Sequence, residues 1–158
     1  MKNTFKRSGA ALISLVLLFV LAVSAGAASS QNVGVKFWKE RSDKESMANS
    51  GIDPDRTATL TRQTNGTYTL TLPVKQVSKM GVTGYLSGLT IGDVTYDGTL
   101  TGDFNKATAV LTIKNLPASV LTGSDVNKSV LVTCNIQMDL QVLGEINTSA
   151  RMCIWNQK

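Results

Sequence analysis

The stretch Ser129-Val130-Leu131-Val132-Thr133-Cys134-Asn135-Ile136-Gln137-Met138-Asp139-Leu140-Gln141-Val142 alternates apolar and polar side chains along its length. One face carries Val130, Val132, Cys134, Ile136, Met138, Leu140 and Val142. Strict alternation is typical of a β-strand that buries one face against a core. We therefore predict a long half-buried strand over 129–142, with Met138 packed in the core among the valines. Gly144 then turns the chain into a last strand over 149–155.

The two cysteines of the chain fall on this predicted hairpin. A turn centred between Leu143 and Gly144 places Cys134 directly opposite Cys153. Directly paired residues on antiparallel strands have Cβ atoms about 4.5–5.5 Å apart, close to the range of a disulfide. We expect a Cys134–Cys153 disulfide, and the alternative is two buried thiols.

Working outward, the rest of the chain also consists of short strand patterns separated by turn signals. Strands are predicted over 33–39, 57–63, 67–74 and 107–114, with two more within 84–96 and turns at Asn65-Gly66 and Asp97-Gly98. Tyr68, Leu70, Leu72 and Val74 are expected to face inward. This pattern is common to immunoglobulin-like sandwiches and small barrels. We predict an all-β fold, an immunoglobulin-like antiparallel β-sandwich of about 7–9 strands.

One segment departs from the strand pattern. Residues 42–51, Ser42-Asp43-Lys44-Glu45-Ser46-Met47-Ala48-Asn49-Ser50-Gly51, form the one clear helix signal beyond the leader. Ser42 or Asp43 can cap the start of a helix, Gly51 can end it, and Pro54 prevents continuation. We therefore expect one short helix of at most two turns.

The first residues have the pattern of an export signal. A cationic leader with Lys2, Lys6 and Arg7 precedes an apolar run, and Ala25-Gly26-Ala27 forms a cleavage site. We predict a cleaved signal peptide at 1–27 and a single domain at 28–158, secreted or held at the cell surface. An uncleaved anchor is the alternative, but the apolar run is short for a spanning helix. After cleavage no membrane insertion is expected.

Charge and composition narrow the functional classes. Three of the 16 Lys and Arg lie in the leader, and all 11 Asp and Glu lie beyond it, so the mature chain carries a charge of only about +2. The positive charges are scattered, which argues against nucleic-acid binding. The chain has no histidine, and its carboxylates are dispersed. We therefore predict that it is not an enzyme, and two other classes stay open: a binding module, and a structural or protein–protein interaction module.

Residues 33–72 resemble the opening third of the near-iron-transporter (NEAT) domain of Gram-positive bacteria. The shared features, in order, are a first strand, a Ser-rich helix with the core Ser46-Met47-Ala48-Asn49, a loop with Pro54, and a strand pair joined by Asn65-Gly66. The remaining two-thirds agree in architecture only. The resemblance implies a surface or extracellular module that binds haem or a related porphyrin, with a cell-surface or host protein as a further expected partner.

In that family the short helix covers a haem that lies against the final hairpin, and the first tyrosine of a YxxxY motif on the last strand holds the iron. Residues 141–152 contain no tyrosine. Soft methionine sulfur is an acceptable ligand for haem iron. The resemblance therefore suggests Met47 and Met152 as iron ligands, with Ser46 and Arg151 completing the ligand site. Arg151 could pair with a propionate or, alternatively, cross-link strands.

Overall fold

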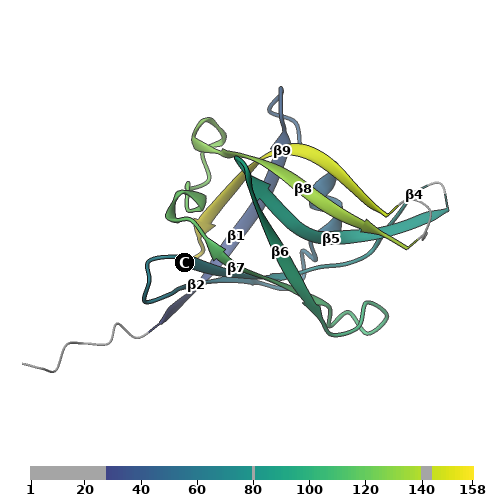
Figure 1. The fold of residues 1–158 in the computed structure, drawn as a ribbon, viewed down its shortest axis with the longest axis horizontal. Helices are drawn as coiled ribbons and strands as arrows, with labels where there is room; N and C mark the ends of the chain where they lie inside the picture. Colours follow the sequence, from purple (N-terminus) through teal and green to yellow (C-terminus); the bar gives the residue numbers. More distant parts are fainter. Residues whose placement is uncertain (1–27, 80, 140–143) are drawn as a thin grey trace, which may run out of the picture.

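The computed structural model describes residues 28–79, 81–139 and 144–158, and the predicted signal peptide at 1–27 lies outside them. The described residues form nine antiparallel strands and three short 3-10 helices (Figure 1). The strands are β1 (Ser29–Lys39), β2 (Ala58–Arg62), β3 (Tyr68–Pro73), β4 (Val77–Lys79), β5 (Val82–Ile91), β6 (Val94–Thr101), β7 (Val110–Leu116), β8 (Val130–Met138) and β9 (Glu145–Asn156). The helices are η1 (Met47–Gly51), η2 (Ala118–Val120) and η3 (Val126–Lys128).

The sheet closes on itself. Its strand order is β4-β5-β6-β7-β3-β2-β1-β9-β8, and β8 pairs back with β5. Eight strands thus form a closed barrel, and β4 is an extra strand paired with the start of β5. The all-β, antiparallel prediction is confirmed, but the predicted sandwich is corrected to a barrel. Alternation shows that a strand has one buried face, but it does not show whether the two ends of a sheet meet.

The barrel closes through an irregularity in β5. The register between β5 and β8 shifts between Leu86 and Gly88. A side chain at Gly88 would be crowded, because a Cβ there would lie 2.7 Å from the carbonyl oxygen of Tyr96. The register shift is therefore a bulge next to Gly88, and it lets β5 bend from one neighbour to the next.

Inward-facing apolar side chains fill the barrel. Leu70, Leu72 and Val74 are buried as predicted, and Tyr68 packs against them while half-buried. On β1, Val33 and Phe37 are buried in the same core. The alternation in β3 therefore predicted its inner face correctly.

Two turn and helix predictions are wrong. Asp97 and Gly98 lie inside β6 rather than in a turn, and a Cβ at Gly98 would lie 2.4 Å from the Leu111 side chain. This glycine therefore allows close packing between strands instead of a reversal. Ser42 and Asp43, the predicted caps, lie in the bend before the helix. The helix begins later, at Met47, and Ser46 is its cap.

The predicted Cys134–Cys153 disulfide is absent, and both cysteines are buried free thiols. The β8–β9 register pairs Cys134 with Thr148, and Cys153 lies opposite Lys36 of β1. Cys134 belongs to the core cluster. Cys153 alternates with the core residues Met152 and Ile154, so it lies on the outer face, where its Sγ is 3.6 Å from the Asp125 carbonyl oxygen. The thiols therefore point to opposite faces of the sheet.

Candidate functional site

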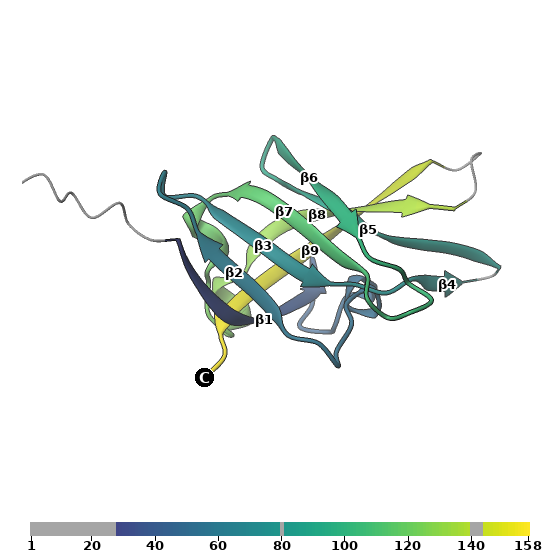
Figure 2. The ribbon, with the colours of Figure 1, turned by 90° about the horizontal axis from the view of Figure 1, so that it is seen from below.

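An apolar pocket lies at the end of the barrel where two hairpins project. The β4–β5 and β8–β9 hairpins extend on the same side of the molecule (Figures 1 and 2). The pocket has a volume of about 240 Å³. It is lined by Met47, Ala48, Gly51, Val77, Val82, Gly84, Tyr85, Leu86, Ile136, Met138 and Thr148. We call it the apolar pocket. It combines η1 with parts of β4, β5, β8 and β9, as the resemblance predicted for a helix that covers the final hairpin.

The helix is fixed to the barrel by one asparagine. Asn49 accepts from the backbone N–H of Phe37 through Oδ1 at 2.8 Å and donates to the Phe37 carbonyl oxygen through Nδ2 at 2.7 Å. With these two hydrogen bonds the side-chain amide takes the place that a backbone amide of a neighbouring strand would occupy. Because both groups of the amide are satisfied, η1 is held against β1, and Ala48 is buried.

Ser46 acts at the start of the helix. Its hydroxyl oxygen accepts from the backbone N–H of Ala48 at 3.3 Å, and its own backbone N–H donates to the Phe37 carbonyl oxygen at 2.9 Å. Ser46 is nearly buried and does not line the apolar pocket. The contacts it makes are those of a helix cap.

Two methionines line the pocket. Met47 lies on the helix with 58% of its surface exposed. Met138 lies at the end of β8, and its sulfur packs over Gly84, where a Cβ would come within 2.8 Å of Sδ. Met138 was predicted to be a core residue, but it is half-buried in the pocket wall. The pocket therefore contains two thioethers, one from the helix and one from the opposite strand.

Met152 takes a different position from the one expected. It faces inward with Ala150 and Ile154, is completely buried, and does not line the apolar pocket. The expectation that Met152 faces the pocket depended on the predicted cysteine register. The structure therefore does not bring Met47 and Met152 together.

Arg151 lies on the outer face of β9 and fixes the turn that precedes the helix. Its Nε donates to the Lys39 carbonyl oxygen at 3.1 Å, and its Nη2 donates to the Ser42 carbonyl oxygen at 2.9 Å. Nη2 also pairs with the Asp43 carboxylate at 2.7 Å. These contacts agree with the alternative in which Arg151 links strands rather than pairing with a propionate. Arg151 does not line the apolar pocket.

The last strand contributes Thr148 to the pocket. Sequence reasoning missed this residue and the apolar pair Val77 and Val82 from the β4–β5 hairpin. The alternation of β9 could have indicated Thr148, since it shares a face with Ala150 and Met152. The contribution of β4 had no comparable signal, because a strand of three residues shows no period.

The described residues contain no group of three or more His, Cys, Asp or Glu side chains that could hold a metal ion. Among these same residues, no helix has the length and apolar character needed to cross a membrane.

Comparison with known proteins shows the fold. The chain is similar to the NEAT5 domain of IsdX2, a B. anthracis hemophore, solved in complex with heme, with 12% identity and a TM-score of 0.53. The match covers 83% of this chain and 98% of the domain. A mutant of the same domain, also in complex with heme, gives the same values. No protein-family model and no curated protein sequence matches the chain. The chain therefore has the fold of a NEAT domain.

Proposed function

We propose that this protein is a non-enzymatic binding module that holds haem or a related porphyrin in the apolar pocket. The observation that carries the proposal is the placement of that pocket, between η1 and the β8–β9 hairpin of a NEAT fold. A mostly apolar concave site with few polar groups suits a flat aromatic ligand. A porphyrin would enter the pocket by one edge and lie partly against the exposed side chains Met47 and Ile146.

The apolar lining suits the polarity of a porphyrin, but the residues present do not supply the ligand that the family uses. The last strand contributes Thr148 to the pocket and no tyrosine, and an alcohol is not among the usual ligands of haem iron. The thioethers of Met47 and Met138 are the available soft donors at the pocket. We therefore propose these two methionines as iron contacts, with Met138 in the role expected of Met152. Ser46 and Arg151 would act by holding η1 and the turn before it.

The proposal includes export. The predicted signal peptide would deliver residues 28–158 outside the cytoplasmic membrane, where haem from the surroundings can be captured, and a cell-surface or host protein could deliver or receive it. Cell fractionation and the N-terminal sequence of the recovered protein test this step. An N-terminus at Ala28 in the extracellular or cell-wall fraction is expected.

The binding test is a titration of the purified protein with hemin, followed in the Soret region. A shifted and saturable band with a stoichiometry of one is expected. A parallel titration with metal-free protoporphyrin separates pocket binding from iron ligation, because only hemin can use the thioethers. If neither compound binds, the porphyrin proposal is wrong, and a structural or interaction module is the remaining interpretation.

Variants locate the site. Met47→Ala and Met138→Ala should each weaken hemin binding about tenfold, equivalent to about 1.4 kcal/mol, and protoporphyrin binding much less. Leu131 is an exposed apolar residue of β8 that does not line the apolar pocket, so Leu131→Ala serves as the control and should leave both affinities unchanged. Thr148→Tyr should tighten ferric hemin binding by adding a phenolate donor. Equal losses for both compounds in the methionine variants would overturn the ligand assignment.

A further inference from the structure

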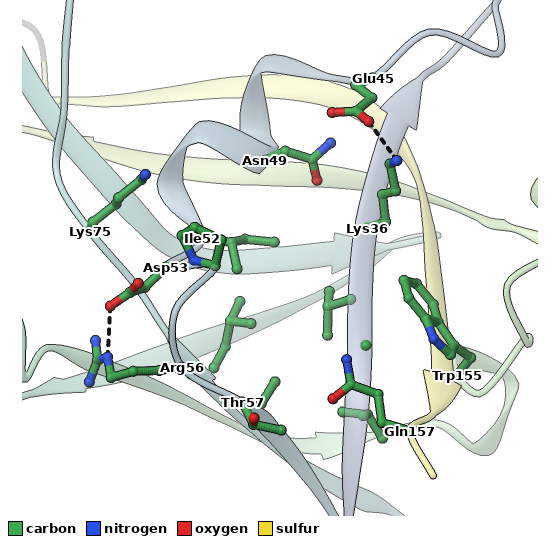
Figure 3. Close-up of a pocket in the computed structure, with 16 residues that line it drawn as sticks. Lys36, Glu45, Asn49, Ile52, Asp53, Arg56, Thr57, Lys75, Trp155 and Gln157 are labelled. Carbon is green, nitrogen blue, oxygen red and sulfur yellow. Dashed lines mark hydrogen bonds and ion pairs between the residues drawn. The ribbon is translucent and has the colours of Figure 1, made fainter.

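A second cavity lies on the other side of the helix (Figure 3). It has a volume of about 340 Å³ and shares no lining residue with the apolar pocket. Its walls are residues 33–36 of β1, the segment that follows η1, and the end of β9. We call it the edge cavity, because it opens where β1 and β2 separate. Its volume lies at the small end of the range for ligand sites, about 300–1,000 Å³.

The main chain of β1 is exposed to this cavity at one residue. The β1–β2 register ends at Val33, which pairs with Ala58. Four residues further along β1, the Asn49 side chain binds the backbone N–H and C=O of Phe37. Successive residues of a strand direct these groups to opposite edges, so Val35 directs its N–H and C=O to the same edge as Phe37.

Val35 is left without a partner on this edge. Among the described residues, none is registered against it on the β2 side and none forms a hydrogen bond to it there. Backbone N–H and C=O groups require partners, from protein, water or a ligand. An open strand edge of this kind is the feature by which proteins bind extended peptides. The gap therefore presents one donor and one acceptor at the spacing of a peptide group.

Trp155 provides a flat wall beside this edge. It lies opposite Gly34, and a Cβ at Gly34 would lie 2.3 Å from two carbons of the indole ring. The absence of a side chain at Gly34 thus allows the ring to lie close against the strand. Figure 3 shows Trp155 beside β1, with Gln157 below it. An aromatic face at this position can cover an apolar group next to a bound amide.

The charges around the cavity leave one cation available. Lys36 pairs with Glu45 at 2.5 Å, and Arg56 pairs with Asp53 at 2.7 Å. The Arg56 Nη2 also donates to the Ala109 carbonyl oxygen at 2.6 Å, so this guanidinium is occupied by the fold. Lys75 is exposed, and within the described part of the chain its ammonium forms no ion pair or hydrogen bond, although its charge helps to lower the pKa of Asp53. The cavity thus has a net positive charge that resides on Lys75.

We propose that the edge cavity binds a short extended peptide segment that ends in a carboxylate. One amide of the ligand pairs with the N–H and C=O of Val35 and continues the interrupted β1 ladder. The carboxylate lies beside Lys75, and Trp155 covers the adjoining side chain. The volume accommodates a segment of one or two residues. The site is separate from the porphyrin pocket, and its test does not depend on porphyrin binding.

The test uses three small probes in NMR titrations of the ¹⁵N-labelled protein. N-acetylglycine carries an amide and a carboxylate, N-acetylglycinamide lacks the charge, and acetate lacks the amide. Saturable shifts at the Val35 amide and the Trp155 indole N–H are expected with N-acetylglycine. N-acetylglycinamide should bind about threefold more weakly, as the loss of one exposed charge contact predicts. The absence of a saturable shift at Val35, or equal binding of acetate, would overturn the proposal.

A pair of lysine variants tests the role of charge. Lys75→Gln should weaken N-acetylglycine binding about threefold and leave N-acetylglycinamide binding unchanged. Lys114→Gln removes an exposed lysine that does not line this cavity, so it should change neither. Equal N-acetylglycine affinities in Lys75→Gln and the unmodified protein would contradict the carboxylate assignment.

Discussion

The apolar pocket and the edge cavity lie on opposite sides of one five-residue helix, yet they differ in what lines them. Met47, Ala48 and Gly51 face the apolar pocket, whereas Asn49 faces the edge cavity. Apolar side chains from two hairpins form most of the first site. In the second, charged groups and an open strand edge are prominent. A short helix can therefore separate two binding surfaces of different chemistry when its apolar and polar side chains lie on different faces of the helix.

The difference also shows how each site is supported. The apolar pocket borders directly on the barrel core, since Cys134 and Ile136 continue one face of β8 from core to pocket. The edge cavity depends on specific polar contacts, above all Asp53 with Arg56 and Asn49 with Phe37. Substitutions beside the first site should act through packing, and substitutions beside the second should act through hydrogen bonds and charge.

The largest expected effect distinguishes the core from the pocket. Met152→Ala should lower the free energy of unfolding by about 3 kcal/mol, because it leaves a cavity in a completely buried position. Met138→Ala should lower it by only about 1 kcal/mol, since Met138 is half-buried at the pocket wall. Urea unfolding of both variants measures this contrast. Equal losses would mean that the apolar pocket is part of the closed core.

The next effect tests the polar support of the edge cavity. The pKa of Asp53 is held below its ordinary value of 3.8, chiefly by the hydrogen bond from Arg56 and further by the backbone N–H of Asp55. Asp53→Asn should lower the free energy of unfolding by about 2 kcal/mol at pH 7, because it weakens a charge-assisted hydrogen bond.

This contribution depends on pH in a defined direction. Because the folded pKa of Asp53 is depressed, the stabilisation is complete above about pH 4 and is lost as the pH falls through the folded value. The difference between the unmodified protein and Asp53→Asn should therefore shrink between pH 4 and lower pH in urea unfolding. Asp55→Asn, at an exposed neighbouring carboxylate, is the control and should show no comparable loss at pH 7.

A smaller effect concerns the helix that separates the two sites. Ser46→Ala removes the hydroxyl that caps η1 and should lower the free energy of unfolding by about 1 kcal/mol. Ser50→Ala changes an exposed serine of the same helix and should be close to neutral. If the Ser46 variant also weakens hemin binding while the Ser50 variant does not, the cap is required for the pocket. Unchanged stability of Ser46→Ala would show that Asn49 alone holds the helix.

The smallest effect is an expected absence of change. The mass of the protein should be the same with and without reductant, because the two thiols face opposite sides of the sheet. Burial raises the pKa of the Cys134 thiol to about 12, so this cysteine should react with thiol reagents at pH 8 only after unfolding. A gain of two mass units on reduction would contradict the register that directs Met152 into the core.

The strand predictions succeeded where alternation and burial agree. Leu70, Leu72 and Val132 face inward because a period of two leaves one face for the core. The helix also ends at Gly51, as predicted. The pattern could not predict the β8–β9 register, since the length of the turn decides which residues pair. Residues 152–155 are all apolar, so they do not mark the inner face of β9 either. The disulfide and the position of Met152 both depended on that register.

The sequence by itself determined the all-β class, the inward face of β3, the presence of one short helix within residues 42–51 and the resemblance to a NEAT domain. These features follow from local periodicity, glycine and proline chemistry, and the order of motifs along the chain. Only the tertiary structure decided that the sheet closes into a barrel, that Met138 rather than Met152 lines the pocket, and that Val35 exposes a main-chain edge. Each of these depends on which strands are neighbours and where their pairing stops, and no local pattern encodes the partner of a strand.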